Sequence, residues 1–143
     1  MPFERRRHPT PDDSEFANPR ARKMYEATER LLDAAPETGR VRQKFLLDSW
    51  NSIRDEFLQQ GESADEARQI AWGTMAFFYA ERVGDIALKI ASNPKLNIQL
   101  FRFELNTLSA WGEMHKLAYN DETKSYIGEP KDYIRFIFRP KRI

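Results

Sequence analysis

The sequence predicts a mainly α protein of four helices, in which a long hairpin of the third and fourth helices is central, an extended arm precedes them and a short β tail follows. Two observations predict this class. Apolar residues recur at intervals of three and four over most of residues 18–119, and only one later segment alternates apolar and polar residues as a strand does. Of the 143 residues 41% are hydrophobic and 13% aromatic, which excludes wholesale disorder. We therefore divide the chain into an arm at 1–17, a helical domain at 18–119 and a β-hairpin or strand tail at 120–143.

The arm at 1–17 contains three prolines and few apolar side chains, so it cannot build a core of its own. Arg5, Arg6 and Arg7 stand together in it and can meet acidic partners, including phosphates. The alternative is that these arginines are simply solvated. We expect the arm to be peripheral to the fold and to dock on a neighbouring molecule.

The first helix is predicted from Pro19 to about Ala34. Asn18 is a favourable N-cap, and the fixed φ of proline suits the first helical position. Pro36 should end this helix because proline cannot continue it.

The second helix is predicted over residues 38–60, with Gly61 as its stop. Its expected buried stripe follows the helical period and consists of Leu46, Trp50, Ile53 and Phe57.

The third helix should open with a capping box at Ser63 and Glu66 and meet no breaker until Asn93, which gives it up to 29 residues. Large apolar residues follow one of its faces and small residues another, so it should be buried on more than one side. Glycine within a helix costs about 1 kcal/mol relative to alanine, and a second helix that approaches closely would offset this cost. The small residues expected to pack against such a helix are Gly73, Ala80, Gly84 and Ala87.

The fourth helix is predicted over residues 94–118. Its first part, 97–105, is rich in Ile, Leu and Phe and is also compatible with a strand. The polar residues recur at intervals of four and three rather than at every second position, and this favours a helix.

In the tail at 120–143 the spacing of apolar residues changes from the helical period to alternation. Residues 132–139 place apolar side chains on one face and arginines on the other, which is typical of a strand. We expect this strand to pair with 125–129 or with a neighbouring subunit, since a single strand cannot satisfy its own backbone. The apolar face expected to dock is Ile134, Phe136 and Phe138, and the charged face carries Arg135 and Arg139.

A helix of 29 residues is about 43 Å long, whereas a compact chain of this size is under about 40 Å across. The flanks of such a hairpin should therefore need further cover. We expect a non-catalytic helical subunit of a larger protein assembly, which is a homo-oligomer or a part of a larger complex with other proteins. An arm, a long helical hairpin and a terminal strand resemble the plan of viral packaging and head–tail connector subunits, an analogy of architecture without a shared motif.

The alternative function is DNA or RNA binding by the basic arm and the helix N-termini. Cations in the first turns of the first two helices oppose the helix dipole, and a bound anion would explain them. The competing explanation is that long side chains lie over apolar neighbours. The cations concerned are Arg20, Arg22, Lys23, Arg40, Arg42 and Lys44.

The sequence offers no catalytic motif. It has no cysteine and only two histidines, His8 and His115, and Glu113 lies on another helix face than His115. A His-Glu-x-x-His motif, a Gly-rich phosphate loop and a nucleophile elbow are all missing from the sequence. We therefore expect no enzyme, no metal and no cofactor, and we place His115 at a helix surface or interface. No apolar run reaches the roughly 18 residues of a membrane helix, so we expect a cytoplasmic or intracellular protein, or one within a virus particle.

Overall fold

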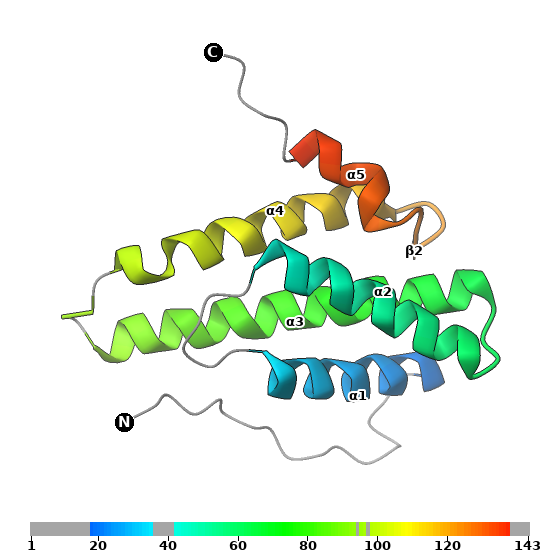
Figure 1. Cartoon of the computed structure of the whole chain (residues 1–143), viewed down its shortest axis with the longest axis horizontal. Coiled ribbons are helices and arrows are strands. Elements are labelled where there is room, and N and C mark those ends of the chain that lie inside the picture. Colours follow the sequence, from blue (N-terminus) through cyan, green and yellow to red (C-terminus); the bar gives the residue numbers. More distant parts are fainter. Residues whose placement is uncertain (1–17, 36–41, 94, 97, 138–143) are drawn as a thin grey trace.

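The computed structural model describes residues 18–35, 42–93, 95–96 and 98–137, and these form a mainly α fold, as predicted (Figure 1). Arg5, Arg6, Arg7, Arg40, Phe138 and Arg139 lie outside the described residues. The elements in chain order are α1 (Pro19–Ala34), α2 (Gln43–Gln59), α3 (Ala64–Ser92), the 3₁₀-helix η2 (Ile98–Phe101), α4 (Arg102–Ala118), β1 (Tyr119–Asn120), β2 (Ser125–Tyr126) and α5 (Pro130–Ile137).

Helix α3 runs along the length of the molecule and the other helices pack around it (Figure 1). Helix α1 is parallel to α3, while α2 and α4 are antiparallel to it. Helices α1 and α2 cover the first half of α3, and α4 runs along α3 on the side away from α1. The second half of α3 and the start of α4 therefore extend beyond α1 and α2, as the length of the predicted hairpin implied.

Both helix starts that the sequence marks with a cap are confirmed. The Asn18 side chain accepts a hydrogen bond from the Ala21 N–H at 2.8 Å, directly before Pro19. Ser63 Oγ accepts from the Glu66 N–H at 3.1 Å at the start of α3, which has the predicted 29 residues. A side chain that bonds an orphan N–H fixes a helix start locally, so distant contacts are not needed to set it.

The two helices without such a cap start later than predicted. Arg42 is extended, with φ −97° and ψ 155°, so α2 begins at Gln43 rather than at residue 38. Residues 98–101 form a 3₁₀ turn, so α4 begins at Arg102 rather than at residue 94. Neither start has a side-chain cap bond. The described part of 97–105 is nevertheless helical, which confirms helix over strand there.

Three tryptophans from three helices form the centre of the core. Trp50, Trp72 and Trp111 are each exposed by 1% or less. The ring centroids of Trp50 and Trp72 lie 5.6 Å apart in an edge-on arrangement, and those of Trp72 and Trp111 lie 6.3 Å apart. The predicted stripe of α2 is buried in full, with Leu46, Trp50, Ile53 and Phe57 all below 10% exposed.

The small residues of α3 that were predicted to pack against another helix are only partly covered in the structure. A Cβ at Gly73 would collide with Met24 of α1, so the predicted close approach of another helix is present there. A Cβ at Gly84 would meet nothing within 4 Å, and Ala80 and Ala87 are exposed. No described helix covers these three residues, so among the described residues the predicted packing is found only at Gly73.

The strand predicted at 132–139 is wrong, because residues 130–137 form the helix α5. Pro130 stands at its first position, and the Asp132 carboxylate accepts the Glu129 N–H at 2.8 Å, as a capping residue does. Pro130, Tyr133 and Ile134 also fit a helical period, and α5 packs against α4. Strand β2 falls within the predicted 125–129, but its partner is β1.

The tail residues expected to dock are therefore helical in part. Ile134 is partly buried against the core, so it docks within the chain rather than on a neighbouring subunit. Arg135 and Phe136 belong to α5, and their side chains are outside the described part of the chain.

Candidate functional site

The second half of α3 presents a continuous apolar surface, which we call the α3 apolar face. At 100° per residue its members span an arc of about 100° and a length of about 21 Å, with no charged residue among them. The side chains of Phe77 and Leu88 are 48% and 56% exposed. The α3 apolar face consists of Phe77, Ala80, Gly84, Ala87, Leu88 and Ala91.

Among the described residues, α1 is too short to cover the α3 apolar face beyond about Ala80. Helix α1 packs on α3 where Met24 faces Gly73, and Thr28 Oγ1 approaches the Thr74 carbonyl at 3.5 Å. Helix α1 ends at Ala34, six residues after Thr28, and it runs parallel to α3. The cover therefore ends at about the level of Ala80, and the rest of the same stripe faces outward.

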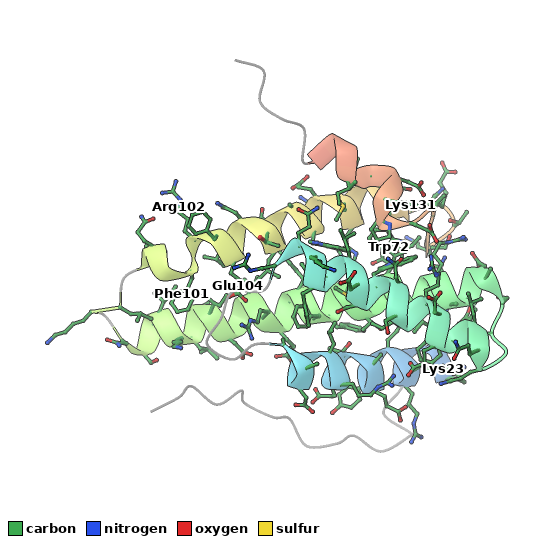
Figure 2. The ribbon with its side chains drawn as sticks, in the orientation of Figure 1. Lys23, Trp72, Phe101, Arg102, Glu104 and Lys131 are labelled. Atoms are coloured by element: carbon green, nitrogen blue, oxygen red, sulfur yellow. The ribbon has the colours of Figure 1, made fainter. Side chains whose placement is uncertain are left out.

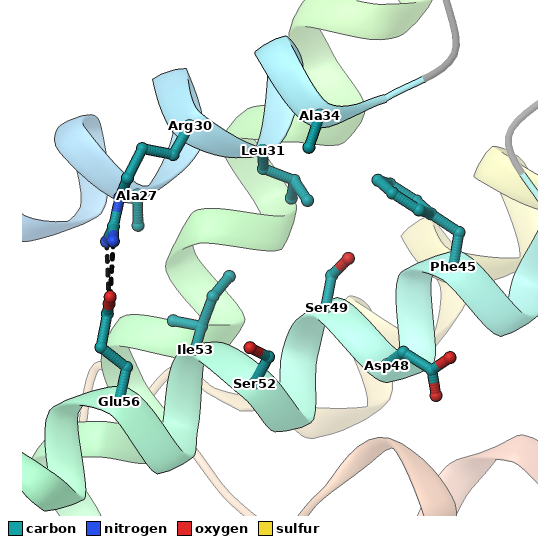
Figure 3. A pocket seen from close by; sticks show the side chains of 10 residues that line it. All are labelled: Ala27, Arg30, Leu31, Ala34, Phe45, Asp48, Ser49, Ser52, Ile53 and Glu56. Atoms are coloured by element: carbon teal, nitrogen blue, oxygen red, sulfur yellow. Dashed lines mark hydrogen bonds and ion pairs between the residues drawn. The ribbon is translucent and has the colours of Figure 1, made fainter.

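A groove of about 410 Å³ lies between α1 and α2 (Figure 3). Its lining combines apolar side chains from both helices, among them Leu31, Phe45 and Ile53. Arg30 and Glu56 form an ion pair across one end, and Phe45 lies toward the other end (Figure 3). The hydrogen bond from Arg30 lowers the pKa of Glu56, so this bridge stays ionised at neutral pH.

A second, more polar pocket of about 480 Å³ lies beside the β-hairpin. Its lining includes Tyr119, Asp121, Glu122 and Tyr133. Among the described residues no group of three His, Cys, Asp or Glu side chains is placed to hold a metal ion.

His115 lies in the aromatic core rather than at the helix surface or interface where the sequence placed it. Its ring lies 5.1 Å from that of Trp72 and 5.7 Å from that of Tyr126, edge-on to both. Within the described part of the chain, neither ring nitrogen has a hydrogen-bond partner. Burial lowers the pKa of His115 from 6.5 to about 4, so the ring is neutral at pH 7. The neutral ring contributes to packing and carries no charge at this pH.

The C-terminal segment is fastened over this cluster by hydrogen bonds from α3. The Gln69 amide donates to the Tyr126 carbonyl and accepts from the Tyr126 N–H, both at 2.7 Å. Trp72 Nε1 donates to the Gly128 carbonyl at 2.8 Å. Sequence reasoning missed both residues as anchors, because their partners are more than 50 positions away.

The cations predicted to meet phosphate are paired with carboxylates in the chain itself. Arg20 bonds both oxygens of Glu66, at 2.6 and 2.5 Å, and Lys23 pairs with Glu62. The pKa of Glu66 is lowered by its hydrogen bond with Arg20, and that of Arg20 is raised by the same bond. Because α1 and α3 are parallel, acids at the start of α3 lie beside cations at the start of α1. These pairs explain why cations stand at a helix N-terminus.

The remaining predicted cations are dispersed. Arg22 pairs with Glu26 at 3.1 Å, and Lys44 pairs with Asp48 at 2.9 Å, each within its own helix. Arg42 is exposed at the start of α2. Arg20 and Lys23 lie close together because each pairs with an acid near the start of α3. The described cations of α1 and α2 do not gather into one basic patch.

A buried ion pair joins the two helices of the hairpin. Arg82 Nε lies 2.5 Å from Glu104 Oε1, and the two side chains are 11% and 5% exposed. Glu104 lies between α3 and α4 (Figure 2). The sequence signal for it was a carboxylate on the apolar side of α4, in register with Leu108 and Trp111.

Comparison with known proteins identifies no relative of this chain. A scan against protein-family models, a search of curated proteins and a search of solved structures each find no match. Within the described residues, every helix is too short or too polar to cross a membrane.

Proposed function

We propose that this protein is a non-catalytic helical subunit of a larger protein assembly and that it docks through the projecting part of its α3–α4 hairpin. The observation that carries the proposal is the α3 apolar face, with Phe77 and Leu88 about half exposed on one side of one helix. Contiguous apolar surface of this kind is typical of a contact with another protein.

The start of α4 and the turn before it add exposed apolar side chains to the projecting end of the α3–α4 hairpin. Phe103 is 65% exposed and Ile98 54% exposed, near the turn that joins α3 to α4. Both ends of the turn therefore offer apolar groups where α1 and α2 give no cover.

The fold weighs against the nucleic-acid alternative at one of its two predicted anchor points. The charges of Arg20 and Lys23 are compensated by Glu66 and Glu62, and a phosphate would have to compete with those carboxylates. The analogy with viral packaging and head–tail connector subunits rested on an arm, a long helical hairpin and a terminal strand. The terminal strand is absent from the described residues, since residues 130–137 are helical.

The deciding experiment is the mass of the full chain in solution by sedimentation equilibrium, with and without a mixed-sequence DNA or RNA. The proposal expects a multiple of the 16.9 kDa chain mass that nucleic acid does not change. A monomer that binds nucleic acid in a salt-sensitive way would favour the alternative, and a monomer inert to it would contradict both.

A matched pair of variants connects the mass to the surface. Phe77→Gln with Leu88→Gln should lower the mass toward that of a monomer, because both side chains are exposed and their loss leaves the core intact. Leu58→Gln removes a comparable exposed leucine on α2, 40% exposed, and should leave the mass unchanged. Thermal unfolding followed by circular dichroism should be similar for all three proteins.

A further inference from the structure

We infer that the α3 apolar face binds a second copy of this chain, with the two α3 helices antiparallel and crossing at Gly84. This inference rests on the proposed function and names the partner of its docking surface. Gly84 is the residue that requires explanation. Its side of α3 is open, no described residue lies within 4 Å of a Cβ built there, and glycine weakens a helix.

The two glycines of α3 differ in the atoms that surround them. At Gly73 the missing side chain makes room for Met24 of α1. At Gly84 the missing side chain makes room for nothing within the described chain. A close partner from outside would use the space at Gly84 as α1 uses the space at Gly73.

The order of large and small residues identifies this partner as the same face of another copy. Around Gly84, Phe77 lies seven residues before and Ala91 seven residues after. Ala80 lies four residues before and Leu88 four residues after. In an antiparallel pair that crosses at Gly84, Phe77 therefore opposes Ala91 of the second copy and Leu88 opposes its Ala80, so both large side chains meet small ones. Ala87 opposes Glu81, which lies at the edge of the face.

The small residues also allow the required distance between the helices. Helices packed through alanine and glycine lie about 8 to 10 Å apart between their axes. Each Cα lies about 2.3 Å from its own axis, so axes about 9 to 10 Å apart would place the two Cα atoms of a Gly84→Cys variant about 4.4 to 5.4 Å apart, within the roughly 4.4 to 6.8 Å that a disulfide spans.

The α3 apolar face is small for a protein–protein interface. A face about 21 Å long is at the small end of specific protein interfaces, which bury about 800 Å² on each partner. Area alone does not fix affinity, and for a pair of this size we expect a dissociation constant on the order of 10 μM.

Cysteine crosslinking tests the inference, because the chain has no cysteine of its own. Gly84→Cys should form a disulfide-linked dimer at a protein concentration above the expected dissociation constant. Ser109→Cys, an exposed position on α4, is the matched control and should crosslink at least tenfold more slowly. The substitution at Gly84 has open space around it, so the fold should be retained.

A mixture of two variants tests the direction of the helices. Phe77→Cys mixed with Ala91→Cys should give a dimer that contains one of each chain, and each variant alone should crosslink poorly. Efficient crosslinking of each variant with itself would mean parallel helices and would overturn the inference.

The result also separates this inference from the proposed function. If the chain is oligomeric by mass and Gly84→Cys crosslinks no faster than Ser109→Cys, the antiparallel pair is refuted and the assembly proposal stands. A monomeric mass at concentrations well above the expected dissociation constant refutes both.

Discussion

Replacing His115 by phenylalanine should remove a large part of the acid sensitivity of this protein. The ring is packed edge-on against Trp72 and Tyr126, and burial lowers its pKa from 6.5 to about 4. The folded state therefore binds a proton less readily than the unfolded state. His115 contributes its full stability above pH 6.5, and this contribution is lost as the pH falls from 6.5 to about 4.

The difference between the two pKa values corresponds to about 3 kcal/mol of unfolding free energy, since each tenfold change in proton affinity is worth about 1.4 kcal/mol. Between pH 8 and pH 5 the loss should be about 2 kcal/mol. This interval is informative because the carboxylates with lowered pKa, Glu56 and Glu66, begin to contribute only at lower pH.

The assay is urea unfolding at pH 5, 6, 7 and 8, followed by tryptophan fluorescence and circular dichroism. Wild type should lose about 2 kcal/mol more than His115→Phe between pH 8 and pH 5. His8→Gln removes the other histidine of the chain and should behave as wild type. Equal pH dependence in wild type and His115→Phe would refute the argument, because it would mean that the ring is accessible to protons in the folded state.

Three further predictions concern single contacts. Gly84→Ala should raise the unfolding free energy of the monomer by about 0.5 to 1 kcal/mol in urea titrations at protein concentrations below the dissociation constant of the pair, whereas Gly73→Ala should give no such gain because Met24 must move. Glu104→Ala should cost about 1.5 to 3 kcal/mol by removing the carboxylate bonded to the largely buried Arg82, while Glu104→Leu with Arg82→Met should restore most of this loss. Equal losses in the single and double variants would contradict the buried-pair argument. Gln69→Ala should cost about 2 to 4 kcal/mol and speed hydrogen exchange at residue 126, and unchanged exchange there would show that the hairpin is held by other contacts.

The tail shows how a sequence pattern can fit two structures. Residues 132–139 alternate as a strand does, but Pro130, Tyr133 and Ile134 also follow a helical period. The Asp132 cap and the packing of α5 on α4 favour the helix. A segment of eight residues has too few side chains to distinguish the two periods, so tertiary contacts decide between them.

The candidate site depends on tertiary structure in the same way. The sequence identified the small residues Gly73 and Gly84 as one stripe that a close helix would cover. It could not show that α1 covers Gly73 and ends before Gly84, because this depends on where α1 sits along α3. It could not show that Arg20 is paired, because Glu66 lies 46 positions away.

The sequence by itself determined the mainly α class, the bounds of α1 and α3, and the buried stripe of α2. These features depend on caps and on periodicity, which act between residues a few positions apart. Only the tertiary structure decided which faces of the helices are covered, which charges are compensated and whether the last segment is a helix. Those outcomes depend on which distant segments lie side by side, and no local pattern specifies that.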